Sequence, residues 1–154
     1  MSDKPFRVLP KLDDGNREFW TAGERGELVF WRCADCGYWI HPPSPRCPAC
    51  LSSNVRTEAV SGRGVVHSFT VNHQNWNPTM PSPYAIALVE LAEQQGLRLM
   101  TNIVDCSPDD VRIGMDVQVV FEQYDDVWLP MFAPAARPSE AAASVADRSG
   151  RAGG

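Results

Sequence analysis

The 154-residue sequence has only two lysines, Lys4 and Lys11, and only three histidines. It carries 14 Lys and Arg residues against 19 Asp and Glu residues, for a formal net charge of -5. Proteins that track a phosphate backbone show the opposite balance, so we expect no nucleic-acid partner. The longest apolar run, residues 84–89, is far shorter than the about 20 residues of a membrane helix. Because nothing resembles a signal peptide either, we expect a cytoplasmic protein without a membrane partner.

The sequence also lacks the short motifs of the common enzyme classes. It contains no G-x-S-x-G turn, no P-loop, no Rossmann glycine triplet and no H-E-x-x-H zinc motif. Cys106 has no histidine near it in the sequence, and a free cysteine without a neighbouring base is usually a buried, unreactive thiol. We therefore expect no catalytic residue in this chain.

The strongest positive signal is the spacing C-x2-C-x10-C-x2-C, formed by Cys33, Cys36, Cys47 and Cys50. Each pair can direct two thiolates at one centre from a tight turn, and four thiolates suit a tetrahedral metal ion. Two disulfides are the alternative, which a reducing cytoplasm disfavours. Four protein ligands leave no open coordination position, so the site is predicted to be structural. We expect Zn²⁺ there, with a rubredoxin-like iron as the less favoured metal.

The 11 glycines and 13 prolines favour strands and loops over long helices. A short helix is expected at residues 14–22, where Phe19 and Trp20 supply an apolar edge. Strands are expected at residues 28–32, 55–60, 65–71, 84–91, 97–104, 116–124 and 128–132. The last five strands fit an OB-fold barrel, with an SH3-like barrel as the main alternative.

The predicted protein is thus mainly β, with a short N-terminal helix and a rubredoxin-like zinc ribbon followed by a five-stranded OB-fold barrel. An N-terminal arm and the helix would occupy residues 1–27, the ribbon residues 28–60 and the barrel residues 61–132. Residues 133–154 are rich in Ala, Ser, Arg and Gly and contain no aromatic residue. They cannot bury enough apolar surface to order themselves, so we expect a disordered tail.

Two features suggest where another molecule would bind. The loop at residues 72–83 carries His73, Asn75 and Trp76, and it is long and unusually rich in Asn for a simple connection. A solvated polar loop is the alternative interpretation. Near the metal module, Trp39 is one of several tryptophans that could anchor a protein partner.

Several segments together resemble a known family. They include the cysteine set, Gly-Arg-Gly-Val-Val-His at residues 62–67, Pro-Tyr-Ala-Ile-Ala-Leu-Val-Glu-Leu at residues 83–91 and Ile-Gly-Met-Asp-Val at residues 113–117. This order is similar to the DUF35 family, whose members are acyl-CoA-associated OB-fold proteins with a rubredoxin-like zinc ribbon. The resemblance covers about residues 19–132.

The resemblance implies a function that the spacing of residues does not show. Members accompany thiolase-like enzymes that make or break carbon–carbon bonds in acyl-CoA thioesters, and they usually have no catalytic residues of their own. By this resemblance the chain is an accessory subunit that stabilises such an enzyme and helps form its CoA channel. The alternatives are a nucleic-acid-binding module and an iron electron carrier. The implied metal ligands are the four cysteines, and the partner- or CoA-proximal residues are Trp39, His73, Asn75 and Trp76.

Overall fold

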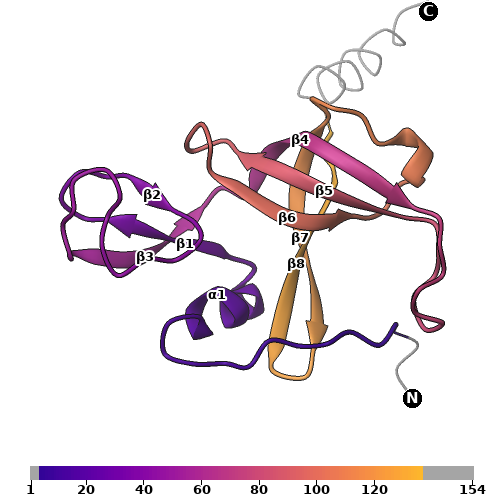
Figure 1. Ribbon diagram of the computed structural model, residues 1–154, viewed down its shortest axis with the longest axis horizontal. Coiled ribbons are helices and arrows are strands. Elements are labelled where there is room, and N and C mark those ends of the chain that lie inside the picture. The colour runs from indigo at the N-terminus through magenta and orange to yellow at the C-terminus, as the bar shows by residue number, and fades with distance from the viewer. Residues whose placement is uncertain (1–3, 137–154) are drawn as a thin grey trace, which may run out of the picture.

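The computed structural model describes residues 4–136, which form a small three-stranded sheet, a short helix and a barrel (Figure 1). The order along the chain begins with α1 (Arg17–Thr21), a 3₁₀ turn η1 (Ala22–Arg25) and β1 (Leu28–Cys33). The remaining elements are β2 (Trp39–Ile40), β3 (Val55–Val60), β4 (Arg63–Asn72), β5 (Tyr84–Leu91), β6 (Arg98–Ile103), η2 (Pro108–Asp110), β7 (Asp116–Tyr124) and β8 (Val127–Pro134). The predicted mainly β class with one short helix is confirmed.

The metal module is built on an antiparallel sheet with the strand order β2-β1-β3. The central strand β1 begins with three buried apolar residues, Leu28, Val29 and Phe30, and ends at a buried cysteine. The sequence prediction missed β2, because a strand of two residues is too short to show a period of alternation.

The second sheet closes into the five-stranded barrel expected for an OB-fold, in the order β4-β5-β6-β8-β7. Strand β7 returns to β4 by pairing residues 116–118 with residues 63–65. β5 lies between β4 and β6, and its burial alternates strictly along its length. Small side chains such as Ala85 and Ala87 face inward, which leaves room in the barrel for the fully buried ring of Phe132.

The barrel is weakly closed at one seam. β6 and β8 run parallel and share a single register pair, Ile103 with Phe132. The buried ring of Phe19 in α1 belongs to the same hydrophobic cluster as the barrel interior and lines a cavity together with Trp20, Leu99 and Met131. The helix therefore covers the apolar interior where the backbone ladder is sparse.

The helix is shorter than the sequence predicted. It begins after Asn16, because residues 13–16 form a turn in which the Asp13 side chain accepts a hydrogen bond from the Gly15 N–H at 2.8 Å. The side chain of Asn16 bonds the backbone of Asp13 instead of capping the helix. Local side-chain bonds therefore replace the first helical turn.

The C-terminal boundary also differs from the expectation. β8 includes Ala133 and Pro134, which pair with Gln118 and Val117 of β7. Strand pairing thus includes the first two residues of the segment 133–154, which was expected to be a disordered tail. Most of that predicted tail, residues 137–154, lies outside the described residues.

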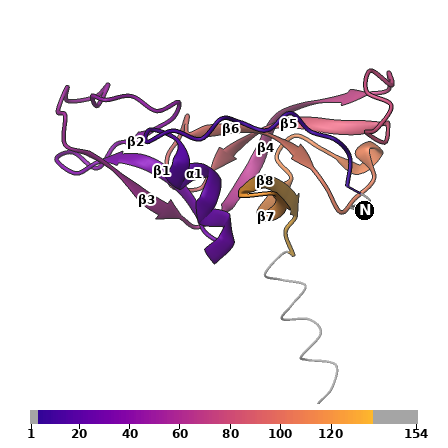
Figure 2. The same cartoon turned by 90° about the horizontal axis from the view of Figure 1, so that it is seen from below.

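The ribbon sheet and the barrel are joined by the β3–β4 connection and by the β5–β6 turn. Seen from below, α1 lies between the ribbon and strands β7 and β8 (Figure 2). Among the residues that the structure describes, no helix has the length and apolar character needed to span a bilayer.

Candidate functional site

The four predicted cysteines converge at one end of the molecule. Cys33 ends β1, while Cys36, Cys47 and Cys50 lie in the loops that flank β2. Their four sulfur atoms all lie within 4.8 Å of one another, and two Sγ–Sγ separations, Cys33 to Cys50 and Cys36 to Cys47, are 3.6 Å. A tetrahedron with Zn–S bonds of about 2.3 Å has edges of about 3.8 Å. The sulfurs are thus close enough together to hold one metal ion with four thiolate ligands.

The two cysteine loops repeat one backbone conformation. In the first, the Gly37 N–H donates to the Cys33 carbonyl at 2.8 Å, and Gly37 has φ 79°. In the second, the Leu51 N–H donates to the Cys47 carbonyl at 2.8 Å, and Leu51 has φ 65°. Each loop presents two sulfurs to the same side, as expected for a pair of metal-binding knuckles. Glycine adopts this left-handed conformation without strain, whereas leucine does not.

Hydrogen bonds hold the two loops to each other. The carboxylate of Asp35 in the first loop accepts hydrogen bonds from the Ser52 hydroxyl and, at 3.0 Å, from the Asn54 side chain. These donors lower the pKa of Asp35, the Ser52 hydroxyl being the larger cause. The Ala34 N–H also donates to the Asn54 carbonyl at 2.8 Å. The ligand geometry is therefore supported by contacts outside the sulfur cluster.

The pKa values of Cys33 and Cys50 are shifted in opposite directions. The Cys36 backbone N–H, helped by that of Asp35, lowers the pKa of Cys33 to about 7. The Ser52 backbone N–H acts in the same direction on Cys50, but the neighbouring Cys36 sulfur and burial outweigh it and raise the pKa of Cys50 to about 12. Four closely packed sulfurs cannot all be ionised without a cation among them. A divalent metal ion supplies that charge by replacing the thiol protons.

Trp39, predicted to contact a partner, lies at the junction between the ribbon and the barrel. Its side chain is only 7% exposed, and the Arg32 guanidinium lies 4.8 Å from its ring centroid. Its backbone N–H donates to Gln94 Oε1 at 2.9 Å, and its carbonyl accepts from Gln94 Nε2 at 3.0 Å. The indole thus packs inside this chain, and Gln94, in the β5–β6 turn, holds β2 against the barrel.

The other predicted contact residues lie on the loop between β4 and β5, at the opposite end of the molecule from the metal module (Figure 1). His73, Asn75 and Trp76 are all exposed, and the Trp76 side chain is 76% exposed. The structure therefore brings the loop residues together with one another but not with Trp39 or the cysteines.

Two features that position these groups were not predicted from the sequence. One is Gln94, whose role depends on which turn meets β2. The other is the N-terminal arm, which reaches the loop: the Phe6 N–H donates to Thr79 Oγ1 at 3.2 Å, and Asn77 Nδ2 donates to the Phe6 carbonyl at 3.3 Å. Neither contact involves a motif, so only the folded structure reveals them.

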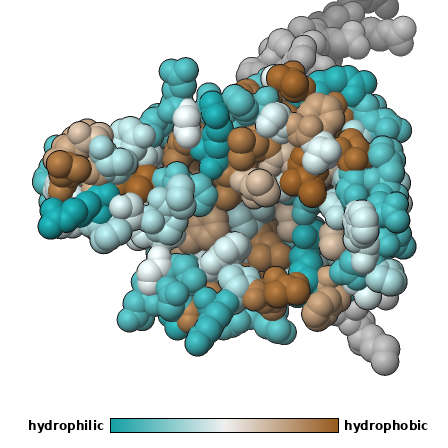
Figure 3. All heavy atoms as spheres, in the orientation of Figure 1, coloured by the Kyte–Doolittle hydropathy of each residue, from teal (hydrophilic) through white to brown (hydrophobic). Residues whose placement is uncertain are grey.

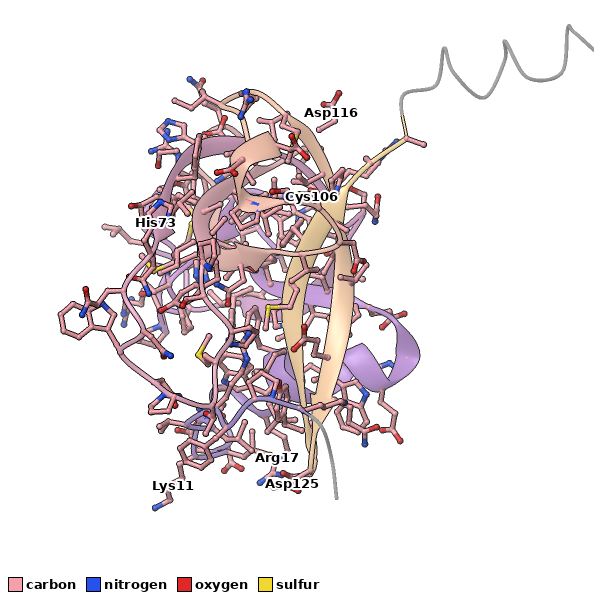
Figure 4. The ribbon with its side chains drawn as sticks, turned by 90° about the vertical axis from the view of Figure 1, so that its right-hand side faces the viewer. Lys11, Arg17, His73, Cys106, Asp116 and Asp125 are labelled. Atoms are coloured by element: carbon pink, nitrogen blue, oxygen red, sulfur yellow. The ribbon has the colours of Figure 1, made fainter. Side chains whose placement is uncertain are left out.

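Cys106 shows no sign of activation. Burial raises the pKa of its thiol, and the nearby carboxylates of Asp110 and Asp105 raise it further. A nucleophilic cysteine requires the opposite shift. Its side chain is partly buried and packs against the hydrophobic core (Figure 4).

Comparison with known proteins identifies both parts of the chain. Residues 20–56 match the family model of the ChsH2 rubredoxin-like zinc ribbon domain, and residues 57–122 match that of the ChsH2 C-terminal OB-fold domain. A DUF35 domain-containing scaffold protein of Methanocaldococcus jannaschii is 39% identical over 102 residues, which cover 65% of this chain and 71% of that protein. The chain belongs to the DUF35 family. The resemblance predicted from its sequence segments is confirmed.

Two further relatives of this DUF35 chain have names that refer to enzymes. A solved structure described as an Ltp2-ChsH2(DUF35) aldolase contains a chain that is 38% identical, with a TM-score of 0.75, covering 83% of this chain and 100% of that one. A probable enoyl-CoA hydratase alpha subunit of Thermomonospora curvata is 39% identical over 138 residues. That match covers 89% of this chain but only 43% of the hydratase subunit. The chain thus spans less than half of that longer relative.

Proposed function

We propose that this DUF35 chain is a non-catalytic accessory subunit of a thiolase-like enzyme that makes or breaks carbon–carbon bonds in acyl-CoA thioesters. The observation that carries the proposal is the match along the full length of a chain in the Ltp2-ChsH2(DUF35) aldolase. The name of the Methanocaldococcus jannaschii relative includes the word scaffold, and that of the longer Thermomonospora curvata relative includes an activity on a CoA ester. A scaffold role also suits a chain whose four clustered thiols are all metal ligands in this proposal.

Within this proposal the barrel and its β4–β5 loop contact the enzyme near the entry path of the CoA ester. The loop residues His73, Asn75 and Trp76 are exposed and project from a rigid two-strand support, which favours an intermolecular role. Trp39 contributes indirectly, because its buried ring and its bonds to Gln94 fix the ribbon against the barrel.

The experiment that tests the proposal is a purification from the native organism with an affinity tag on this chain. Mass spectrometry should identify a larger thiolase-like chain in a stoichiometric complex. The purified complex should act on an acyl-CoA, the isolated DUF35 chain should not, and the partner alone should lose activity or stability. A partner with full activity and unchanged stability in the absence of this chain would contradict the proposal.

We further propose that the four cysteines bind one structural Zn²⁺, which orders residues 28–60. The set of four thiolates with no room for a water ligand supports a structural role, and the same chemistry admits iron. Elemental analysis should find one zinc per chain, in a protein without visible absorbance. A coloured protein with one iron would instead support the electron-carrier alternative. Retention of the protein on single-stranded nucleic acid at low salt would support the alternative of a nucleic-acid-binding module.

A further inference from the structure

The face of the molecule that carries the N-terminal arm exposes several large apolar side chains. The most exposed are Phe6 at 65%, Val8 at 89%, Trp76 at 76% and Met100 at 71%. We call these four residues, with the basic residues of the arm, the docking face. Hydrophobic residues gather over the barrel on this side and are surrounded by hydrophilic ones (Figure 3). Single apolar side chains this exposed are common on protein surfaces, whereas several on one face point to an interaction site.

The arm is fixed to the barrel and not free in solvent. It is extended, and exposure alternates along it, so that Phe6 and Val8 face outward while Arg7 faces the barrel. Arg7 Nη1 donates to Asn102 Oδ1 at 3.1 Å, and Lys4 Nζ donates to the Gln123 carbonyl at 2.7 Å. The apolar side chains of the arm are therefore presented in a defined position, which lowers the entropic cost of binding a partner.

The remaining members of the docking face adjoin the arm. Trp76 belongs to the loop whose residues Asn77 and Thr79 bond the backbone of Phe6. Its Nε1–H donates to Asn72 Oδ1 at 3.2 Å, so the polar atom of the indole is satisfied within the chain while its rings remain exposed. Met100, on β6, lines the same cavity as Arg7. The loop residue His73 and the arm residue Lys11 project on the same side of the molecule (Figure 4).

The arm over residues 4–12 is basic, unlike the chain as a whole, and Asp13 and Asp14 follow it directly. Residues 4–12 include both lysines of the protein, Lys4 and Lys11, together with Arg7, and they include no acidic residue. The whole chain nevertheless has a net charge of -5. A partner with acidic groups around an apolar surface is complementary to this face. A symmetric dimer is not, because an isologous contact would place the basic arm against its own copy.

We propose that the docking face binds an acidic, apolar surface of the partner enzyme subunit. Phe6 and Trp76 are the anchors, since aromatic side chains dominate the energy of protein interfaces. Lys4 and Lys11 orient the encounter through long-range attraction. This inference rests on the proposed function, because it assumes that an enzyme subunit is the partner.

The experiment measures the affinity of the purified partner chain, once identified, for variants of this chain by titration calorimetry. We expect Phe6→Ala and Trp76→Ala each to weaken binding by about tenfold to thirtyfold. Ile113→Ala is the matched control, because this side chain is 71% exposed but belongs neither to the arm, the β4–β5 loop nor β6. The control should leave the affinity within twofold, and equal urea midpoints should show that all three variants are folded.

A second measurement tests the charge. Lys11→Glu should slow association at low salt and have little effect at high salt, since exposed charges are screened within about 10 Å at 0.1 M. An equal effect at both salt concentrations would contradict the steering role of the arm.

The outcomes separate this inference from the proposed function. If the unaltered chain binds the enzyme and the anchor variants bind equally well, the docking face is wrong and the proposed function stands. If the unaltered chain binds no enzyme chain, both fail. If Phe6→Ala and Trp76→Ala convert a dimer of this chain to monomers, or abolish binding to anionic lipid vesicles instead, the face serves a different occupant and the inference is rejected.

Discussion

The contact between Gln94 and Trp39 makes a strong prediction about how the metal module and the barrel depend on each other. β2 has two residues and pairs only with β1, so one of its edges would be left without a partner strand. The side-chain amide of Gln94 takes that place by bonding both the N–H and the carbonyl of Trp39, at 2.9 and 3.0 Å. A barrel residue thereby completes the ribbon sheet.

We expect Gln94→Ala to lower the free energy of unfolding of the metal-loaded protein by about 2 kcal/mol. Two partly buried hydrogen bonds are lost, each with a net contribution of about 1 kcal/mol. Gln95→Ala is the matched control, because the adjacent side chain is exposed and makes none of the recorded side-chain hydrogen bonds among the described residues. Its effect should stay within about 0.5 kcal/mol. Urea unfolding followed by tryptophan fluorescence measures both values.

The same pair of variants tests the coupling to the metal. When the metal is removed by a chelator, β2 loses the cysteine loops that hold it, so Gln94 has less ordered backbone to bond. Gln94→Ala should then lower the free energy of unfolding by much less than it does in the metal-loaded protein. The difference between the two decreases is the coupling free energy. An equal cost with and without metal, or a cost no larger than that of Gln95→Ala, would refute the reasoning.

Four further substitutions test other parts of the fold. Leu51→Gly should raise the stability of the metal-loaded protein by about 0.5 to 1 kcal/mol, because it relieves a left-handed residue with φ 65°. Gly37→Leu should do the opposite in the first loop. Gly64→Ala should lower stability by about 1 to 3 kcal/mol, because a Cβ would lie 2.5 Å from the Glu90 carbonyl oxygen in the β4–β5 ladder. Burial lowers the pKa of His41 in the folded protein below the 6.5 of a free imidazole. The unfolded chain therefore binds more protons than the folded chain below pH 6.5, so the free energy of unfolding should fall as the pH drops below 6.5. His41→Phe should remove that part of the pH dependence.

Urea midpoints of the metal-loaded proteins test each of these expected changes in stability. A destabilising Leu51→Gly would mean that the leucine side chain makes a contact worth more than its backbone strain. An unchanged midpoint for Gly64→Ala would mean that the strand pair shifts without cost. For His41, the slope of stability between pH 7.5 and pH 5.5 is compared in the two proteins, and identical slopes would show that another group titrates in that range.

Much of the fold was accessible from the sequence because its signals are local. The strand prediction at residues 55–60 agrees with β3, and those at residues 84–91 and 116–124 agree with β5 and β7, since alternation and turn residues mark them directly. The cysteine set was equally clear, because a metal site prescribes ligand type and spacing. The predicted start of the helix at residue 14 was wrong. Side-chain hydrogen bonds within residues 13–16 compete with the first helical turn, and helix propensities do not account for such bonds.

By itself, the sequence determined that four cysteines would form one site, that a five-stranded β unit would follow and that the chain resembles DUF35 proteins. Only the tertiary structure decided that Trp39 packs inside the chain, that Gln94 joins the ribbon to the barrel and that the basic arm lies against the β4–β5 loop. The physical reason is the range of the interactions. Spacing and alternation act over a few residues, whereas these contacts join residues 55 to 73 positions apart, and the folded backbone alone brings them together.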